Sequence, residues 1–189
     1  MAFNINEITA TISKSGVARA DFFDVVFSGL PTSLGSTREL SLRAESVTLP
    51  QRSVQPLDYK DYGVPFKIGG LANYVEIDMT FLLSEDLRER EFFMKWQDLI
   101  VGDHRTRIQL SRGSQFDIGY FNTYKCDGIV INHYSGKKNE DSPNHKIKLI
   151  DAYPLQIATI SRSWAQPEFM RQQVTFTYRY FTEFGYTDE

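Results

Sequence analysis

One stretch of strict alternation, residues 73–83, constrains the fold more than any other feature. Its apolar positions are Val75, Ile77, Met79, Phe81 and Leu83, and polar or acidic residues alternate with them. Successive side chains of a β-strand point to opposite faces of the sheet, so a period of two predicts a strand with one face in the core. The other face carries Glu76 and Asp78. We therefore expect the core to be built on a sheet.

The spacing becomes helical directly after this strand. Ser84 is a residue type that caps helices, and Glu85 and Asp86 follow it, where the helix dipole favours acidic side chains. The apolar side chains at helical spacing are Phe92, Phe93, Trp96 and Leu99. Gly102 is a natural stop. The sequence therefore predicts a helix at about residues 85–101 that packs these four side chains into the core.

Further strands are predicted from apolar, β-branched and aromatic runs along the chain. They are residues 19–27, 39–49, 124–134, 146–153, 156–160 and 172–181. The high content of Phe (14) and Tyr (10) suits pleated, half-buried surfaces and also protein–protein contacts. These features indicate a mainly β fold, a β-sandwich or small barrel with one flanking helix. At 189 residues the chain fits a single domain, residues 1–189.

Two segments between the predicted strands are expected to be loops. Residues 51–72 contain Pro56, Pro65 and three glycines, and a loop of this length in a compact domain is often functional. Its apolar members include Leu57, Tyr59, Tyr62 and Phe66. They suggest that the loop docks, either onto another molecule or back onto its own domain. Residues 135–144 (SGKKNEDSPN) are polar with glycine and proline, which predicts a solvated hairpin loop.

The sequence contains no pattern that supports an enzyme, a metal site or a cofactor. The histidines are His104, His133 and His145, and none lies at metal-ligand spacing to another His or to Cys. His133 and His145 flank the same hairpin, but ordinary strand-end roles are favoured over a metal site. Cys126 is the single cysteine, so an intramolecular disulfide is impossible, and no base that would activate it as a nucleophile can be identified.

Charge and hydropathy disfavour two further classes of partner, nucleic acids and membranes. The net charge of −3 disfavours tight binding of nucleic acid, because phosphate-binding proteins usually carry a basic surface. Residues 1–12 lack a basic segment followed by an apolar run, so no signal peptide is predicted. No apolar run reaches the roughly 20 residues that a membrane-spanning helix needs. We expect a protein that folds in a reducing cytoplasm and has no membrane partner.

The order of several segments resembles the tail tube protein of contractile-tailed (myovirus-type) bacteriophages. The matching stretches are residues 44–50 (AESVTLP), residues 74–83 with the helix that follows, and residues 152–180. The resemblance covers residues 18–182. It implies a β-sandwich or barrel subunit that forms hexameric rings, in which inner strands join into one barrel around a lumen. Rings would stack into a tube inside a contractile sheath, and genomic DNA would pass through the lumen without specific binding.

The resemblance also implies partners, a location and site residues. The partners are further copies of the chain, the tail sheath protein, and the baseplate and tape measure proteins. The location is the tail tube of the virion, after synthesis in the host bacterial cytoplasm. A mildly acidic wall repels DNA phosphates, and the candidates for it are Glu76, Asp78 and Glu45. The candidates for contacts between subunits are Leu57, Tyr59, Tyr62 and Phe66.

Several other functions share this fold. A baseplate tube initiator, a tube terminator, and the tube subunit of a phage-derived contractile injection system or type VI secretion system are all compatible. A uniform polymer would favour the main tube, and a single ring would favour an initiator or terminator. From a different class, a ligand-binding β-barrel needs a roomy polar cavity, whereas the strand faces predict a core filled with aliphatic and aromatic side chains.

Overall fold

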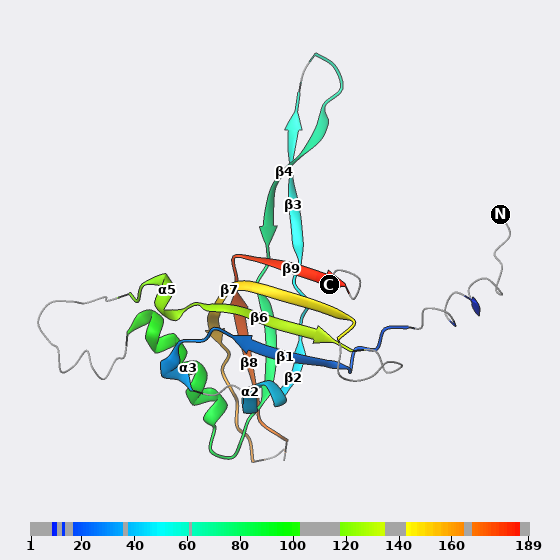
Figure 1. Ribbon diagram of the computed structural model, residues 1–189. Coiled ribbons are helices and arrows are strands. Elements are labelled where there is room, and N and C mark those ends of the chain that lie inside the picture. The colour runs from blue at the N-terminus through cyan, green and yellow to red at the C-terminus, as the bar shows by residue number, and fades with distance from the viewer. Residues whose placement is uncertain are drawn as a thin grey trace, which may run out of the picture.

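One seven-stranded antiparallel sheet forms the body of the protein, in the order β1-β6-β7-β8-β5-β2 with β9 paired to β7 (Figure 1). The computed structural model describes residues 9–10, 13, 17–35, 38–60, 62–102, 118–134, 143–164 and 168–185. The strands of this sheet are β1 (Phe23–Ser28), β2 (Ala44–Val47), β5 (Ile77–Leu82), β6 (Cys126–His133), β7 (His145–Ile157), β8 (Arg171–Thr177) and β9 (Tyr180–Gly185). The prediction of a mainly β fold is confirmed.

The long strand β7 belongs to both halves of the sheet. Its first part, residues 145–150, pairs with β6 and β9, and its last part, residues 153–157, pairs with β8. Between them Asp151 adopts φ 55°, a left-handed conformation that Asp tolerates better than most residues. The ammonium of Lys125 lies 2.6 Å from the Asp151 carboxylate and fixes it there. The sheet therefore turns at this point, and its two halves face each other.

The core lies between these two halves. One half contributes Val25, Phe27, Ile129, Ile131, Ile147 and Leu149, and the other Ile77, Met79, Phe81, Val174 and Phe176. The Phe27 ring centroid lies 6.4 Å from that of Phe81 and 6.1 Å from that of Phe176, so aromatic rings bridge the halves. The period-two prediction is confirmed for Ile77–Leu82, and the core is filled with side chains.

A helix, α3 (Arg88–Val101), closes the core from the side. Phe93 and Trp96 are fully buried, and Phe92 and Leu99 are half-buried. Trp96 makes edge-on ring contacts with Phe27 and Phe176, and its indole N–H donates a 2.6 Å hydrogen bond to the carbonyl of Tyr124. The predicted core side of the helix is thus confirmed. Shorter helices, which the sequence did not predict, are η1 (Thr32–Leu34), α2 (Arg38–Leu42) and α5 (Phe121–Tyr124).

The start of α3 differs from the prediction, because Glu85 and Asp86 lie in a turn before the helix. A buried carboxylate holds this turn. Glu89 accepts 2.8 Å hydrogen bonds from the backbone N–H and the hydroxyl of Ser84, and pairs with the Arg43 guanidinium at 3.1 Å. The Ser84 hydroxyl also accepts a 3.3 Å hydrogen bond from the N–H of Arg88, so the helix begins at residue 88 and not at residue 85. The predicted stop is confirmed, since α3 ends at Val101 and Gly102 follows it with φ 83°.

Replacing Glu89 with glutamine is expected to lower the free energy of unfolding by about 1–3 kcal/mol at neutral pH. Burial alone would raise the pKa of Glu89, but the hydrogen bonds from Ser84 and the charge of Arg43 outweigh it and lower the pKa. The folded state then has the lower pKa, so the stabilisation is present above the pKa of free glutamate and is lost as the pH falls. Urea denaturation of both proteins at neutral and acidic pH measures the effect.

The matched control for this substitution is Glu91→Gln, which removes an exposed ion pair with Lys95 on the same helix. Its expected effect is small at every pH. If Glu89→Gln lowered the free energy of unfolding equally at neutral and acidic pH, the account would be contradicted, because the charge would then contribute none of the stabilisation.

Most predicted strands have different bounds, and β7 was predicted as two strands. Residues 19–27 form a strand only from Phe23, and of residues 73–83 only Ile77–Leu82 belong to β5. Residues 39–49 divide into α2 and β2, because α2 buries Leu40 next to β1. Residues 172–181 divide into β8 and β9, and residues 124–134 begin with the end of α5. Residues 146–153 and 156–157 belong to the single strand β7, and residues 158–160 of the second prediction lie beyond its end. Pro154 is tolerated inside β7 because it lies at a register shift, where one ladder hydrogen bond is missing.

Residues 51–72 are not an irregular loop, and this prediction is wrong. They form most of a second, two-stranded antiparallel sheet of β3 (Arg52–Tyr59) and β4 (Phe66–Tyr74). Pro56 lies at a register shift, and Gly70 approaches the opposite strand so closely that a Cβ would lie 2.7 Å from the Gln55 carbonyl oxygen. The proline and glycine residues that suggested a loop thus lie where the pairing of the hairpin is irregular.

Two further predictions concern residues at the edge of the described structure. Of the predicted hairpin loop 135–144, residues 135–142 lie outside the described residues, as does His104. The strands that flank this segment are paired, with His133 opposite His145. Within the described residues, no helix is long and apolar enough to cross a membrane.

Candidate assembly arm and lumen face

The β3–β4 hairpin projects from the body as a separate arm, hereafter the arm (Figure 1). All four residues predicted for contacts between subunits lie on it. Leu57, Tyr59 and Phe66 are each at least 47% exposed, and Tyr62, near the turn, is 107% exposed. Tyr59 and Phe66 face each other across the two strands with ring centroids 5.1 Å apart. The structure therefore gathers these residues and leaves them accessible.

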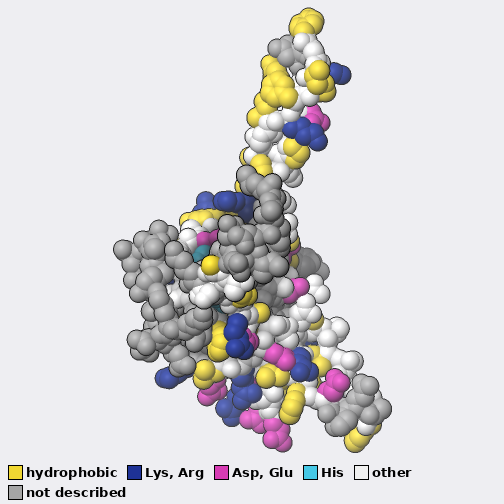
Figure 2. All heavy atoms as spheres, turned by 90° about the vertical axis from the view of Figure 1, so that its right-hand side faces the viewer, with side chains coloured by type: hydrophobic (Ala, Val, Ile, Leu, Met, Phe, Trp, Pro, Cys, Tyr) yellow, Lys and Arg dark blue, Asp and Glu magenta, His cyan; other side chains and the backbone are white. Residues whose placement is uncertain are grey.

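Hydrophobic side chains follow the arm along its length, as Figure 2 shows. The other exposed ones are Val54, Val64, Ile68 and Leu71. The alternative that the segment folds back onto its own domain does not hold, because the arm points away from the body. An isolated two-stranded hairpin is marginally stable in water, and large exposed apolar patches typically mark interaction sites. The arm has the properties of a docking element.

The base of the arm is tied to the body by hydrogen bonds. The Thr48 hydroxyl accepts a 2.8 Å hydrogen bond from the backbone N–H of Asp78, and the N–H of Val75 donates to the Gln51 carbonyl at 3.3 Å. The Tyr178 hydroxyl donates to the Val75 carbonyl at 2.8 Å. The arm is thereby a bent extension of the β2–β5 pair at the edge of the sheet.

The second candidate site is the outer face of strands β2, β5 and β8, hereafter the polar face. Its side chains alternate with the buried ones and include Glu45, Asp78, Thr80, Arg171, Gln173 and Thr175. Asp78 accepts a 2.6 Å hydrogen bond from the Thr175 hydroxyl on the neighbouring strand. Two of the three residues predicted for a lumen wall, Glu45 and Asp78, thus share one face. Glu76 lies exposed just before β5.

The charge of this face is lower than the acidic residues alone suggest. Arg171, which sequence reasoning did not single out, lies with its guanidinium 2.6 Å from the Glu45 carboxylate. Within the described residues, Glu76 and Asp78 make no ion pair. The pKa of the Tyr178 hydroxyl is raised by burial and by the nearby charge of Glu76. The result is a face of hydroxyls, amides and a weak negative charge.

Two of the residues considered for chemistry, Cys126 and His145, lie in the described part of the chain. Burial raises the pKa of the Cys126 thiol to about 12, so it stays protonated at neutral pH. His145 Nε2 lies 3.9 Å from a Glu183 carboxylate oxygen. Among the residues that the structure describes, no group of three or more His, Cys, Asp or Glu could hold a metal ion.

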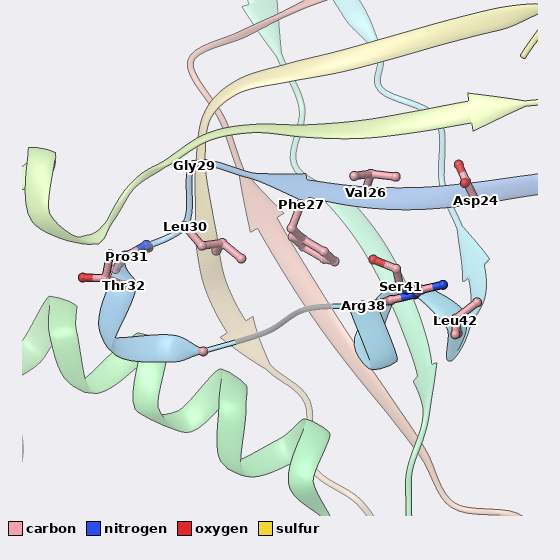
Figure 3. Close-up of a pocket in the computed structure, with 11 residues that line it drawn as sticks. Asp24, Val26, Phe27, Gly29, Leu30, Pro31, Thr32, Arg38, Ser41 and Leu42 are labelled. Carbon is pink, nitrogen blue, oxygen red and sulfur yellow. The ribbon is translucent and has the colours of Figure 1, made fainter. Parts of the chain in front are cut away.

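A groove on the outside of the body, hereafter the α2 groove, lies between β1 and α2 (Figure 3). It has a volume of about 680 Å³. Its lining includes Val26, Leu30 and Leu42, with Arg38 on α2. Because the groove lies outside the filled core, it does not restore the hypothesis of a ligand-binding barrel, which needs an internal cavity.

Comparison with solved structures shows the same fold in contractile injection systems. In the sheath–tube complex of the PVC extracellular contractile injection system, the similar chain is 15% identical, with a TM-score of 0.62 and coverage of 94% of this chain and 97% of that chain. In the tube-terminating cap of the anti-feeding prophage, the similar chain is 13% identical with a TM-score of 0.59, and the match covers 89% of this chain and 91% of that chain. In the PVC sheath/tube terminator, the similar chain is 13% identical with a TM-score of 0.56, and the match covers 89% of this chain and 97% of that chain. At these identities the likeness shows the fold alone.

The sequence itself was compared with curated proteins and with protein families. No curated protein sequence matches the chain. The family model of phage tail tube proteins matches residues 2–183. Since this match covers nearly the whole chain, the chain belongs to the phage tail tube protein family, and it is a structural protein of the tube and not an enzyme.

Proposed function

We propose that the protein is the main tube subunit of a contractile phage tail, which forms hexameric rings that stack into the conduit for DNA ejection. The observation that carries this proposal is the arm, an extended hairpin with exposed apolar side chains on a tail-tube body. Further partners in this proposal are the tail sheath, the baseplate and the tape measure protein. Solved structures of similar fold come from a sheath–tube complex and a baseplate, which supports the sheath and the baseplate as partners. Synthesis takes place in the host bacterial cytoplasm.

The length of the arm favours a contact between successive rings. Strand β4 has 9 residues, which span ~30 Å at the rise of an extended strand. The body strand β5 has only 6 residues, so the arm is longer than the strands it extends. A projection of this length reaches beyond its own subunit. In our proposal Leu57, Tyr59, Tyr62 and Phe66 anchor it on a copy in the adjacent ring.

The polar face is the proposed wall of the lumen. A conduit must not hold the DNA that passes through it, and basic side chains would bind phosphates. The face instead offers threonine hydroxyls, glutamine amides, an internally neutralised Glu45–Arg171 pair and the carboxylate of Asp78. Exposed Glu76 adds a second negative charge. Weak repulsion, with no cluster of basic side chains among the described residues of this face, would let DNA slide.

Replacing Glu76 and Asp78 with lysine is expected to slow DNA ejection several-fold while tubes still form, because the wall would then attract phosphates. Virions carrying the double variant are measured for DNA release in low and high salt, since screening should relieve the effect. Glu76→Gln with Asp78→Asn serves as the matched control that removes charge without reversing it. Normal ejection by the lysine variant at low salt would remove these residues from the lumen.

The alternatives are a tube initiator or a tube terminator, and the solved terminators of similar fold keep the latter open. Electron microscopy of the concentrated protein separates them from the main tube. Open-ended tubes of uniform diameter support the proposed main-tube role. Single rings that never stack would support an initiator or terminator instead.

A further inference from the structure

We propose that the end of the body opposite the arm carries the site that receives the arm of a second copy in the adjacent ring. This site, hereafter the acceptor cleft, lies in the connection between β7 and β8 and is lined by residues 159–163 and 168–171. The inference deepens the proposed function and rests on it, because it requires rings that stack. It names the surface that each arm contacts.

The arm and the acceptor cleft lie at opposite ends of the same strand. The arm leads into β5 at Ile77, whereas the cleft lies beside the last residue of β5, since Leu82 pairs with Arg171. The N–H of Leu83 also donates a 3.0 Å hydrogen bond to the carbonyl of Met170. Figure 1 shows the same arrangement, with the arm above the sheet and the β7–β8 connection below it. The subunit therefore has two different ends along the direction of these strands.

The arm and the acceptor cleft also belong to one half-sheet. In the order β7-β8-β5-β2, the arm extends the β2–β5 pair, and the cleft lies where the chain passes from β7 to β8. The polar face, our proposed wall of the lumen, is the outer face of this same half-sheet. Two sites on one half-sheet lie at a similar distance from the axis of a tube that the half-sheet lines. Coaxial rings can therefore bring the arm of one copy to the cleft of another.

A tube of many rings requires two different surfaces at each junction between rings. A surface that bound only its own counterpart would join two rings and then stop, whereas a head-to-tail contact can be repeated without limit. In a head-to-tail stack, the end that carries the arm faces the end that carries the cleft at every junction. The arm of a second copy is therefore the occupant that such a stack supplies.

Aromatic side chains and a guanidinium give the acceptor cleft the chemistry to bind the arm. The cleft has a volume of about 510 Å³. Phe169 lines it and is 83% exposed, and Trp164, which follows one of its walls, is 106% exposed. Arg162 also lines the cleft and makes no ion pair within the described residues. Guanidinium groups stack well on aromatic rings, and aromatic side chains dominate the energetics of protein interfaces.

The arm carries groups that complement those of the cleft. Tyr62 and Phe66 are exposed on the arm, so their rings are available to stack on a guanidinium or on other aromatic rings. Lys60 and Lys67 are also exposed on the arm, whereas Glu168 lines the cleft. Opposite charges across an interface favour the correct partner and orientation. Docking would bury hydrophobic side chains that an isolated subunit leaves in water at both ends.

Tryptophan fluorescence tests the contact, because the two tryptophans of the chain lie in opposite environments. Trp96 is fully buried, and Trp164 is fully exposed in the isolated subunit. Acrylamide quenching is measured in unassembled protein and in tubes, and the Trp164→Phe variant gives the contribution of Trp96. We expect the quenching of Trp164 to fall several-fold in tubes, with its emission at shorter wavelength. Tubes in which Trp164 stays as accessible as in unassembled protein would overturn the inference and leave the proposed function intact.

Substitutions within the cleft test its part in stacking. Phe169→Ser combined with Arg162→Ser is expected to leave ring formation intact and to raise the protein concentration needed for stacking at least ~10-fold. Met94→Ser, on the exposed face of α3, is the matched control and should stack at the concentration of the unsubstituted protein. Stacking of the double variant at that same concentration would overturn the inference.

The last comparison shows whether the arm is what covers the cleft. Single rings are prepared from a variant in which the arm anchors are replaced by serine, namely Leu57, Tyr59, Tyr62 and Phe66. Trp164 should remain fully quenchable in these rings. Its protection there would overturn the inference, because a neighbour in the same ring would then cover the cleft. Failure of the unsubstituted chain to form rings or tubes would contradict the proposed function itself.

Discussion

Trp96→Ala is expected to remove roughly 3–5 kcal/mol from the free energy of unfolding. Trp96 is fully buried and packs against Phe27 and Phe176, which come from the two halves of the sheet. Its loss opens a cavity at the point where the helix and both half-sheets meet. The carbonyl of Tyr124 also loses its hydrogen bond from the indole. Because folded domains are stable by only about 5–15 kcal/mol, much of this variant should be insoluble when expressed.

Chemical denaturation of the soluble fraction measures the effect, with two comparison variants. Trp96→Phe keeps most of the ring and removes the indole N–H, so the difference between Trp96→Phe and Trp96→Ala isolates the cavity. Met94→Ala truncates an exposed side chain of the same helix and should change stability by less than ~0.5 kcal/mol. Unchanged stability of Trp96→Ala would show that α3 does not close the core as described.

Removing the hydrophobic anchors of the arm is expected to abolish tube formation without unfolding the body. In the variant with Leu57, Tyr59, Tyr62 and Phe66 all replaced by serine, the core residues are untouched. Each large anchor at an interface can contribute about 2 kcal/mol or more, so the concentration needed for assembly should rise at least ~100-fold. Light scattering follows assembly, and circular dichroism with thermal denaturation follows the fold.

The matched control changes the same arm without removing apolar area. Lys60→Ser with Lys67→Ser substitutes two charged positions on β3–β4 and its turn and should shift the assembly concentration far less. Assembly of the four-serine variant at the concentration of the unsubstituted protein would contradict the docking role of the arm. An equal loss of assembly in the serine variant and in the lysine control would instead indicate that charge contributes most to the contact.

The elements that the sequence predicted well are those whose pattern is imposed by the core. Ile77, Met79 and Phe81 alternate because one face of β5 is buried, and Phe93 and Trp96 follow helical spacing because one side of α3 is buried. The arm has no such constraint. Its strands pair with each other and not with the core, so no strict alternation appears, and Pro56 and Gly70 at its irregular points suggested a loop.

Long-range pairing explains what the sequence could not show about the candidate sites. Arg171 neutralises Glu45, yet the two are 126 residues apart and meet only because β2 and β8 both flank β5. Likewise Ser84 was expected to cap a helix that begins at residue 85, but its hydroxyl donates to the buried carboxylate of Glu89 and accepts from the N–H of Arg88, where the helix begins. The apolar residues of the arm were predicted as anchors from their chemistry alone, and the structure leaves them exposed.

Cryo-electron microscopy of the assembled polymer, or of the isolated tail, tests the central claim most directly. The account predicts a hollow tube of stacked hexameric rings, with the polar face of β2, β5 and β8 lining the lumen and the arm seated on the adjacent ring. A tube whose lumen is lined by another face, with the arm free in solvent, would contradict the assignment of both sites. Protein that remains monomeric even with a tail baseplate as template would contradict the proposed function itself.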